Sequence, residues 1–202
     1  KKIYFYLQYY YIYSYLKSHE RCTMVFDDAT VTFSQADFQS FNWTDFYGNV
    51  KEVIPPNAPK PRGNPVQTTA FVDANHAGNQ VTRRSHSGIL IYCNSSPIAW
   101  YSKAQATVET STFGSEFVAL RVATELIEAL RYKLRMFGVP IDGPTNVLCD
   151  KKTVVDNSTV PSSTLKKKHN AFCYPRVREA VAAQIIRIAH VPTGQNLADM
   201  FT

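Results

Sequence analysis

Four acidic residues lie in sequence contexts that could together hold divalent cations. Two of them directly follow apolar runs, at residues 69–72 and 146–149, one lies within a long helical pattern, and one lies in the short segment 196–201. Carboxylates are hard oxygen ligands that suit Mg²⁺ or Mn²⁺, and several of them close together cannot all stay ionised unless cations neutralise them. If the fold gathers them, they form a metal site. The four candidate ligands are Asp73, Glu116, Asp150 and Asp199.

Each candidate also has an ordinary structural interpretation. Asp73 and Asp150 could be turn residues that close strands, since aspartate favours such positions. Glu116 could interact with the helix dipole in a first helical turn, and Asp199 could be a capping or surface residue. Taken one at a time, none of the four distinguishes between these interpretations, and only their joint occurrence favours a shared site.

The elements expected after residue 66 begin with three strands and a long helix. Three short β-rich runs follow one another with short connections, which predicts an antiparallel meander. A helix comes next, because apolar residues recur every three or four positions from Phe113 to Leu134, and Gly138 and Pro140 end the pattern. The expected strands are residues 67–72, 88–93 and 98–102, with a turn at 94–97, and the expected helix runs from 111 or 112 to about 137.

The rest of the chain alternates between strand and helix patterns. This order predicts an α/β fold with a mixed five-stranded sheet, three antiparallel strands then two parallel ones, flanked by helices. Carboxylates at strand ends and on the adjoining helix would then meet at one edge of the sheet. The expected elements are a strand at 146–149, helices at 152–157 and within 169–184, a strand at 185–190 and a helical turn from 195.

The charge distribution suits a polyanionic partner. The net charge is +6, and residues 67–202 carry fifteen Lys and Arg against ten Asp and Glu. Four of those ten acids are the candidate ligands, so the remaining surface of this segment is more basic than its net charge suggests. A mildly basic protein without such a partner remains the alternative on charge alone. The basic residues singled out for nucleic-acid contacts are Arg83, Arg84, Lys103, Lys166, Lys167 and Lys168.

The cysteines and the apolar runs indicate the class of protein. The four cysteines show no short paired spacing, so we interpret them as reduced core residues of an intracellular protein rather than disulfides or zinc ligands. No run reaches the roughly 18 apolar residues of a membrane helix. The aromatic run 3–18 is expected to be a helix cut from something larger, and it could mediate self-association.

A boundary between two parts of the chain is expected near residue 66. Residues 54–65 contain five prolines and one glycine, which suits an ordered linker rather than a helix or a central strand. Before this linker, the sequence predicts the helix at 3–18, a short strand around 23–26 and an aromatic stretch at 38–47. This is too little regular structure for an independent domain. The predicted division is therefore residues 1–66 and residues 67–202.

Six motifs in this order resemble the ribonuclease H domain of copia-type LTR retrotransposon Pol polyproteins. Any one alone would be weak, but together they extend over essentially all of residues 67–202 with family-like spacing. Residues 1–66 resemble the end of the reverse transcriptase region and its connection. The six motifs are Phe71–Gly78, Arg83–Gly88, Pro97–Lys103, Thr107–Leu120, Leu148–Asp150 and Leu197–Thr202.

The resemblance implies a two-metal endoribonuclease. Two Mg²⁺ ions, with Mn²⁺ as an alternative, would activate a water and stabilise the leaving oxygen as the RNA strand of an RNA·DNA hybrid is hydrolysed. By motif, Asp73 would bridge both ions, Glu116 and Asp150 would hold one, and Asp199 the other. The implied partners are the hybrid and the reverse transcriptase domain of the same polyprotein, with no membrane. The implied location is cytoplasmic, in virus-like particles.

Three departures from the family pattern affect the expected activity. Lys151 replaces a usual Asn beside the third aspartate; it could point away from the metals or weaken their binding. Pro175 falls in the penultimate helix, where an interior proline costs about 3 kcal/mol unless the helix starts there. Asn75 replaces a common acid, with little effect expected.

No general base is assigned, with His169 and His190 the nearest candidates. An alternative function is a decayed or repurposed module that binds nucleic acid or supports the polymerase without cutting.

Overall fold

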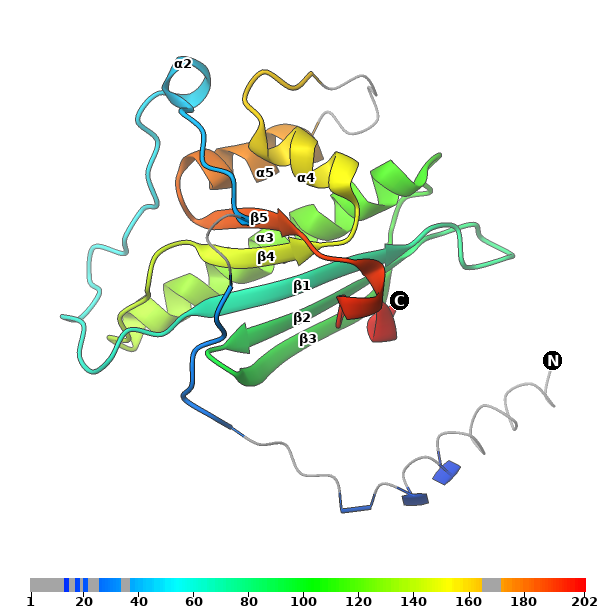
Figure 1. Cartoon of the computed structure of the whole chain (residues 1–202), viewed down its shortest axis with the longest axis horizontal. Helices are drawn as coiled ribbons and strands as arrows, with labels where there is room; N and C mark the ends of the chain where they lie inside the picture. The colour runs from blue at the N-terminus through cyan, green and yellow to red at the C-terminus, as the bar shows by residue number, and fades with distance from the viewer. Residues whose placement is uncertain (1–12, 15–16, 19, 22–25, 34–36, 165–171) are drawn as a thin grey trace.

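The structure is a computed structural model of the 202-residue chain (Figure 1). It describes residues 13–14, 17–18, 20–21, 26–33, 37–164 and 172–202. The expected helix at residues 3–18 and the expected strand at 23–26 lie mostly outside the described residues. The lysine run 166–168 and His169 lie outside them altogether.

Five strands form one mixed sheet in the order β3-β2-β1-β4-β5. β1 pairs antiparallel with β2 and parallel with β4, β2 pairs antiparallel with β3, and β4 pairs parallel with β5. This is the ribonuclease H-like topology, and the predicted fold class is confirmed. The strands are β1 (Thr68–Asn75), β2 (His86–Cys93), β3 (Ser96–Ala104), β4 (Thr145–Cys149) and β5 (Ile186–His190).

The turn expected at residues 94–97 is shorter in the structure. Asn94, with φ of +53°, makes the turn, and β3 already begins at Ser96, so Pro97 lies within a strand. The sheet accepts a proline here because β3 is an edge strand, and the pairing with β2 is also irregular between Ile91 and Tyr92. The strand expected at residues 98–102 is therefore present, but it begins two residues earlier than expected.

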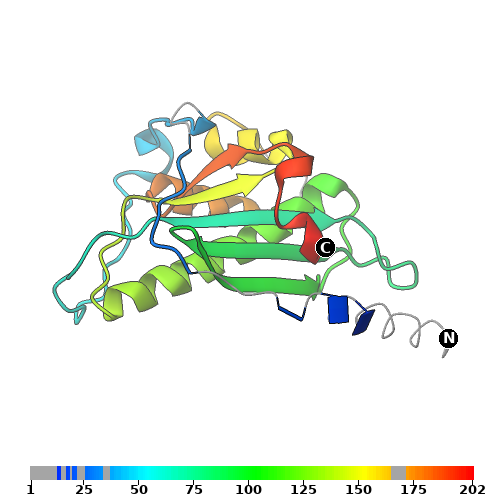
Figure 2. The same ribbon diagram turned by 60° about the horizontal axis from the view of Figure 1, so that its bottom comes forward.

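The long helix α3 (Thr112–Met136) crosses one face of the sheet (Figures 1 and 2). Ser111 caps its first turn, because the serine hydroxyl accepts a hydrogen bond from the Gly114 amide at 3.3 Å. Its apolar stripe is fully buried at Phe117, Leu120 and Ile127, against the sheet residues on that face. The helix ends near Gly138, whose φ of +71° suits glycine. The predicted bounds of this helix are confirmed.

Two shorter helices, α4 (Lys152–Thr159) and α5 (Cys173–Ala182), pack beside α3 and the parallel strands. Pro175 lies in the first turn of α5, two residues after the start rather than at it. An amide in the first turn has no partner within the helix, so the proline removes no helical hydrogen bond. Pro175 is therefore compatible with the helix, which lies within the expected range of residues 169–184.

The chain after β5 forms two short 3₁₀ turns, η3 (Thr193–Gln195) and η4 (Asp199–Phe201). The helical turn expected from residue 195 is thus wrong in position, because residue 195 ends the first turn. η4 lies over the face of the sheet opposite α3, against β1 and β2 (Figures 1 and 2). This placement brings the C-terminal segment to the end of the sheet at which β1 finishes, where Thr202 contacts Asp73.

Residues 37–52, which precede β1, pack onto the sheet. Trp43, just before the short helix α2 (Thr44–Tyr47), is buried in the main core. Phe38 packs against Leu148 on the opposite face. The carboxylate of Glu52 binds two arginines of α3. These contacts tie residues 37–52 to the sheet, and the predicted boundary near residue 66 stays a prediction.

Candidate metal centre

Asp73 and Asp150 lie side by side at the edge of the sheet where the parallel pairing of β1 with β4 ends. The last paired residues of β1 and β4 are Val72 and Cys149, and an aspartate follows each of them directly. Asp73 still lies within β1, which continues to Asn75 rather than ending at residue 72 as expected, whereas Asp150 follows β4. Residues just past the last pair of a parallel ladder remain close in space. Asp73 is buried with 7% of its surface exposed, whereas Asp150 is half-buried.

Glu116 reaches this edge from the first turns of α3. It is buried, with 6% of its surface exposed, and its Oε2 has no hydrogen-bond partner in the described part of the chain. One oxygen of Glu116, one of Asp150 and the Sγ of Cys149 lie within 4.8 Å of one another. Asp73 and Asp199 do not belong to this group of mutually close atoms. The structure therefore gathers two of the four candidate ligands tightly and the other two around them.

Asp199 is exposed and opens η4, close enough to Asp73 for its charge to raise the pKa of that carboxyl. Its position depends on Asn196, whose Nδ2 donates a 2.9 Å hydrogen bond to the carbonyl of Val72. It also depends on Gly88, the partner of Asp73 across the β1–β2 pairing. A side chain at Gly88 would come within 2.6 Å of the Ala198 carbonyl oxygen, so η4 can lie against the sheet only because glycine is there.

The electrostatics of the cluster indicate a surplus of negative charge. Burial, followed by the charges of Asp73 and Asp150, raises the pKa of Glu116 from 4.5 to about 9. Burial also raises the pKa of Asp73, with Asp150 and Asp199 adding to the effect and the Thr202 hydrogen bond opposing it. Carboxyl groups whose pKa is raised in this way by burial and by neighbouring negative charge release their protons to solvent when a cation binds beside them.

Two hydroxyl groups fix the aspartates that flank Glu116. Thr202 Oγ1 donates to Asp73 Oδ2, and Thr193 Oγ1 donates to Asp150 Oδ2, each at 2.8 Å. Sequence reasoning missed both threonines, and it missed Asn196 and Gly88. Their roles depend on contacts between segments far apart in the chain. Gly88 and Thr202 lie within two of the six motifs, but the motifs gave neither residue a role.

Lys151 directly follows Asp150, at the N-cap of α4. Its positive charge is close enough to lower the pKa of Glu116, although the net shift of that group remains strongly upward. The Lys151 charge therefore acts on Glu116, and the orientation of its ammonium relative to the metals stays a prediction. The side chain is half-buried at the start of α4.

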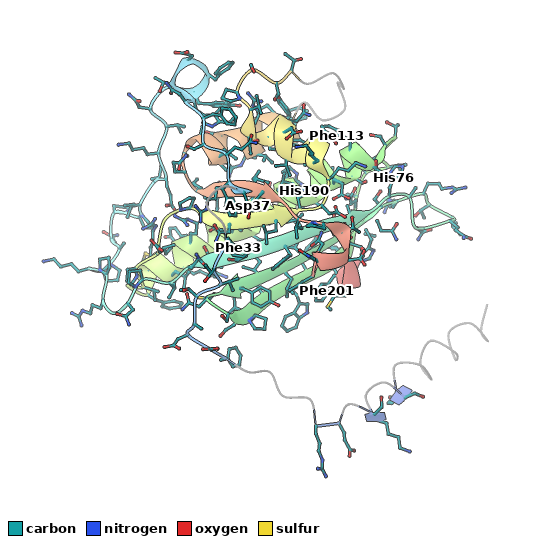
Figure 3. The ribbon with its side chains drawn as sticks, in the orientation of Figure 1. Phe33, Asp37, His76, Phe113, His190 and Phe201 are labelled. Carbon is teal, nitrogen blue, oxygen red and sulfur yellow. The ribbon has the colours of Figure 1, made fainter. Side chains whose placement is uncertain are left out.

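The donor set fits the metal that the fold family implies. Hard oxygen ligands converge at one edge, and one buried carboxylate oxygen lacks a partner among the described residues. Figure 3 labels three residues around this end of the sheet: His76 in the loop after β1, His190 at the end of β5 and Phe201 in η4. The His190 Nε2 is 3.0 Å from the Asp150 carbonyl oxygen, which gives that imidazole a structural partner.

The basic residues proposed for nucleic-acid contacts lie near this edge where the structure describes them. Arg83 and Arg84 are exposed in the loop between β1 and β2, and Lys103 is exposed near the end of β3. Arg83 has a positive φ of 56° in that loop. Their exposure leaves them accessible to phosphates, and their role stays a prediction.

No helix in the described part of the chain is long and apolar enough to cross a membrane.

No protein-family model matches the sequence. The chain is 28% identical over 141 residues to the Retrovirus-related Pol polyprotein from transposon RE2 of Arabidopsis thaliana, and 29% identical over 132 residues to that from transposon TNT 1-94 of Nicotiana tabacum. These matches cover 70% and 65% of this chain but only 10% of either relative.

Among solved structures, the chain is similar to LC11-RNase H1, which was crystallised in complex with an RNA/DNA hybrid. The TM-score is 0.54 with 17% sequence identity, and the match covers 67% of this chain and 93% of that one. At this identity the match concerns the fold alone, and it agrees with the observed order of the five strands. The chain is therefore a homologue of copia-type retrotransposon Pol polyproteins over about 70% of its length, and it has the ribonuclease H fold.

Proposed function

We propose that the chain is a metal-dependent endoribonuclease that hydrolyses the RNA strand of RNA·DNA hybrids during reverse transcription of a retrotransposon. The observation that carries the proposal is the buried Glu116 carboxyl beside Asp150. One of its oxygens has no hydrogen-bond partner among the described residues, and the charge of Asp73 acts on it. Burying an ionised carboxylate without a partner costs free energy, and a bound cation removes that cost. The LC11-RNase H1 complex supports the choice of a hybrid as substrate.

The four carboxylates would together bind two divalent cations, Mg²⁺ or Mn²⁺. Bound there, such ions supply Lewis-acid stabilisation of the phosphate and an activated water. Asp73 would contact both ions, Glu116 and Asp150 one, and Asp199 the other. The hydroxyls of Thr202 and Thr193 would keep the oxygens of two of these ligands oriented before the ions arrive.

The exposed arginines and lysine near the centre would bind the backbone of the hybrid. Arg83, Arg84 and Lys103 would contact phosphates, and the run at 166–168, which lies outside the described residues, would add to the same surface. Phosphate contacts of this kind make affinity fall as salt rises. Contacts with 2′-hydroxyls would then provide the preference for RNA over DNA.

The test is cleavage of the labelled RNA strand of a hybrid by the purified full chain with Mg²⁺. We expect cleavage by the wild type and none above background by Asp150→Asn, because that substitution removes a metal ligand while keeping the size of the side chain. Asp142→Asn is the matched control, since Asp142 is exposed and precedes β4 at its other end. Activity that survives Asp150→Asn would refute the site.

A second candidate function follows from Lys151. Its ammonium acts on Glu116, so it could displace one cation and leave a module that binds hybrids or supports the polymerase without cutting. This function predicts salt-dependent hybrid binding without turnover, and partial recovery of cleavage in Lys151→Asn. Its partners would be the hybrid and the reverse transcriptase domain of the same polyprotein.

Self-association through the aromatic segment at residues 3–18 and a place in cytoplasmic virus-like particles stay predictions. Sedimentation of the full chain, compared with a variant that carries serines in place of Phe5 and Leu7, measures the first of them. We expect the wild type to self-associate and the variant to sediment as a monomer.

A further inference from the structure

A thiol lies inside the carboxylate centre. Cys149, the last residue of β4, is fully buried, and its Sγ lies within 4.8 Å of one oxygen of Glu116 and one of Asp150. The nuclease chemistry proposed above does not use this sulfur, because Mg²⁺ and Mn²⁺ prefer oxygen ligands. A sulfur atom changes which cations the same place can hold.

A second observation indicates that the place is built to receive a ligand. Glu116 is more than nine-tenths buried, and its Oε2 has no hydrogen-bond partner in the described part of the chain. Asp150 completes a set of three donors, two oxygens and one sulfur, on adjacent elements. The same Glu116 oxygen also supports the hard-cation centre proposed above, so the sulfur beside it is the feature that points to a second class of cation.

We propose that Cys149, Glu116 and Asp150 form a site for a thiophilic divalent cation, Zn²⁺ or Cd²⁺, that overlaps the Mg²⁺ centre. Zn²⁺ accepts thiolate and carboxylate ligands together, and three protein ligands with one open position are a common arrangement for it. Ligand atoms around a tetrahedral Zn²⁺ stand roughly 3.5 Å apart. The three donors already lie within 4.8 Å of one another, so small side-chain movements bring them to that spacing. Binding breaks the S–H bond of Cys149, forms the metal–sulfur bond and releases the proton to solvent.

The proposal has a consequence for the neighbouring centre. A cation held by the sulfur uses carboxylate oxygens of Glu116 and Asp150, so it excludes the hard cation that these residues would otherwise hold. Zn²⁺ and Cd²⁺ are therefore expected to exclude Mg²⁺ from the centre without taking over its proposed role. The binding itself goes beyond the proposed function and holds equally for a chain that cuts nothing.

The experiment is a titration of the metal-free full chain with Cd²⁺, read from the ultraviolet thiolate-to-cadmium charge-transfer band. We expect one strong equivalent in the wild type, loss of the band in Cys149→Ser, and binding roughly tenfold weaker in Glu116→Gln. Cys93→Ser and Cys173→Ser are matched controls, because both residues are half-buried free thiols that do not belong to the group of three donors, and both variants should keep the band. A band that survives Cys149→Ser, or that Glu116→Gln leaves unchanged, overturns the proposal.

A second measurement does not depend on how well the variants fold. X-ray absorption of the Zn²⁺-loaded wild type should show one sulfur among its oxygen ligands, and a spectrum with oxygen ligands only contradicts the site. Neither readout involves RNA cleavage. Failure of the nuclease test therefore leaves this result standing, and failure here leaves the nuclease proposal standing.

Discussion

Replacing Glu116 with glutamine should stabilise the metal-free protein. The pKa of Glu116 is raised to about 9, mainly by burial and then by the charges of Asp73 and Asp150, whereas the unfolded chain titrates near 4.5. Between these values the folded protein holds a proton that the unfolded chain has released. The free energy of unfolding therefore falls as pH rises, by at most about 1.4 kcal/mol per pH unit. At pH 7 this amounts to about 3 kcal/mol.

Glu116→Gln removes the titrating group and keeps its shape. We expect the variant and the wild type to have equal free energies of unfolding at about pH 5. At about pH 7 the free energy of unfolding of the variant should be higher by up to about 3 kcal/mol. The assay is urea unfolding with a chelator present, at several pH values across this window. Glu125→Gln is the control, because Glu125 lies on the same helix but is exposed and paired with Arg121, and its effect should stay below about 0.5 kcal/mol.

The same account predicts how Mg²⁺ changes the thermal stability of the wild type and of Glu116→Gln. Mg²⁺ should raise the melting temperature of the wild type, because it binds the folded state only, and it should have a much smaller effect on Glu116→Gln. Parallel pH curves for the two proteins, or equal stabilisation of both by Mg²⁺, would show that Glu116 does not carry the unfavourable charge of the cluster.

Three further predictions concern residues around the centre. Gly88→Val should move η4 by about 1 Å and reduce hybrid cleavage roughly a hundredfold with the fold retained by circular dichroism, whereas Gly194→Ala, with open space around it, should not. Lys151→Asn should lower the Mg²⁺ concentration needed for half of the thermal stabilisation roughly tenfold, or about 1.4 kcal/mol, because a competing charge is removed. Glu52→Ala should cost about 3 kcal/mol in urea unfolding, because it leaves the buried guanidinium of Arg131 without its carboxylate, and an unchanged midpoint would contradict that account.

Most of the fold could be predicted from local patterns. The stripe from Phe113 to Leu134 predicted α3 because a helix that covers a sheet must be apolar on one side only. The strands were predicted because β-rich runs alternate with turn residues. The errors lie where distant contacts decide, as at Pro97, which an edge strand accepts, and at η4, whose position depends on Gly88 in another strand.

The candidate site shows the same division between local and distant information. Chain order and the strand ends pointed to Asp73 and Asp150, and the register of β1 with β4 places them at one edge. The proximity of Cys149 to Glu116 could not be predicted, because a buried cysteine at a strand end has the same pattern as any core residue. The roles of the carboxylates themselves stay predictions until cleavage and binding are measured.

The balance between Lys151 and the carboxylates decides which of the two proposed functions is favoured. The lysine charge already acts on Glu116, yet burial and the neighbouring aspartates still raise the pKa of Glu116 to about 9. The tethered ammonium therefore leaves most of the negative charge without compensation. Glu116 Oε2 has no partner in the described part of the chain, so Lys151 does not complete it by a hydrogen bond either. A divalent cation can do both, since it carries twice the charge and coordinates oxygens directly, and for this reason we favour the metal-dependent nuclease over the module that only binds.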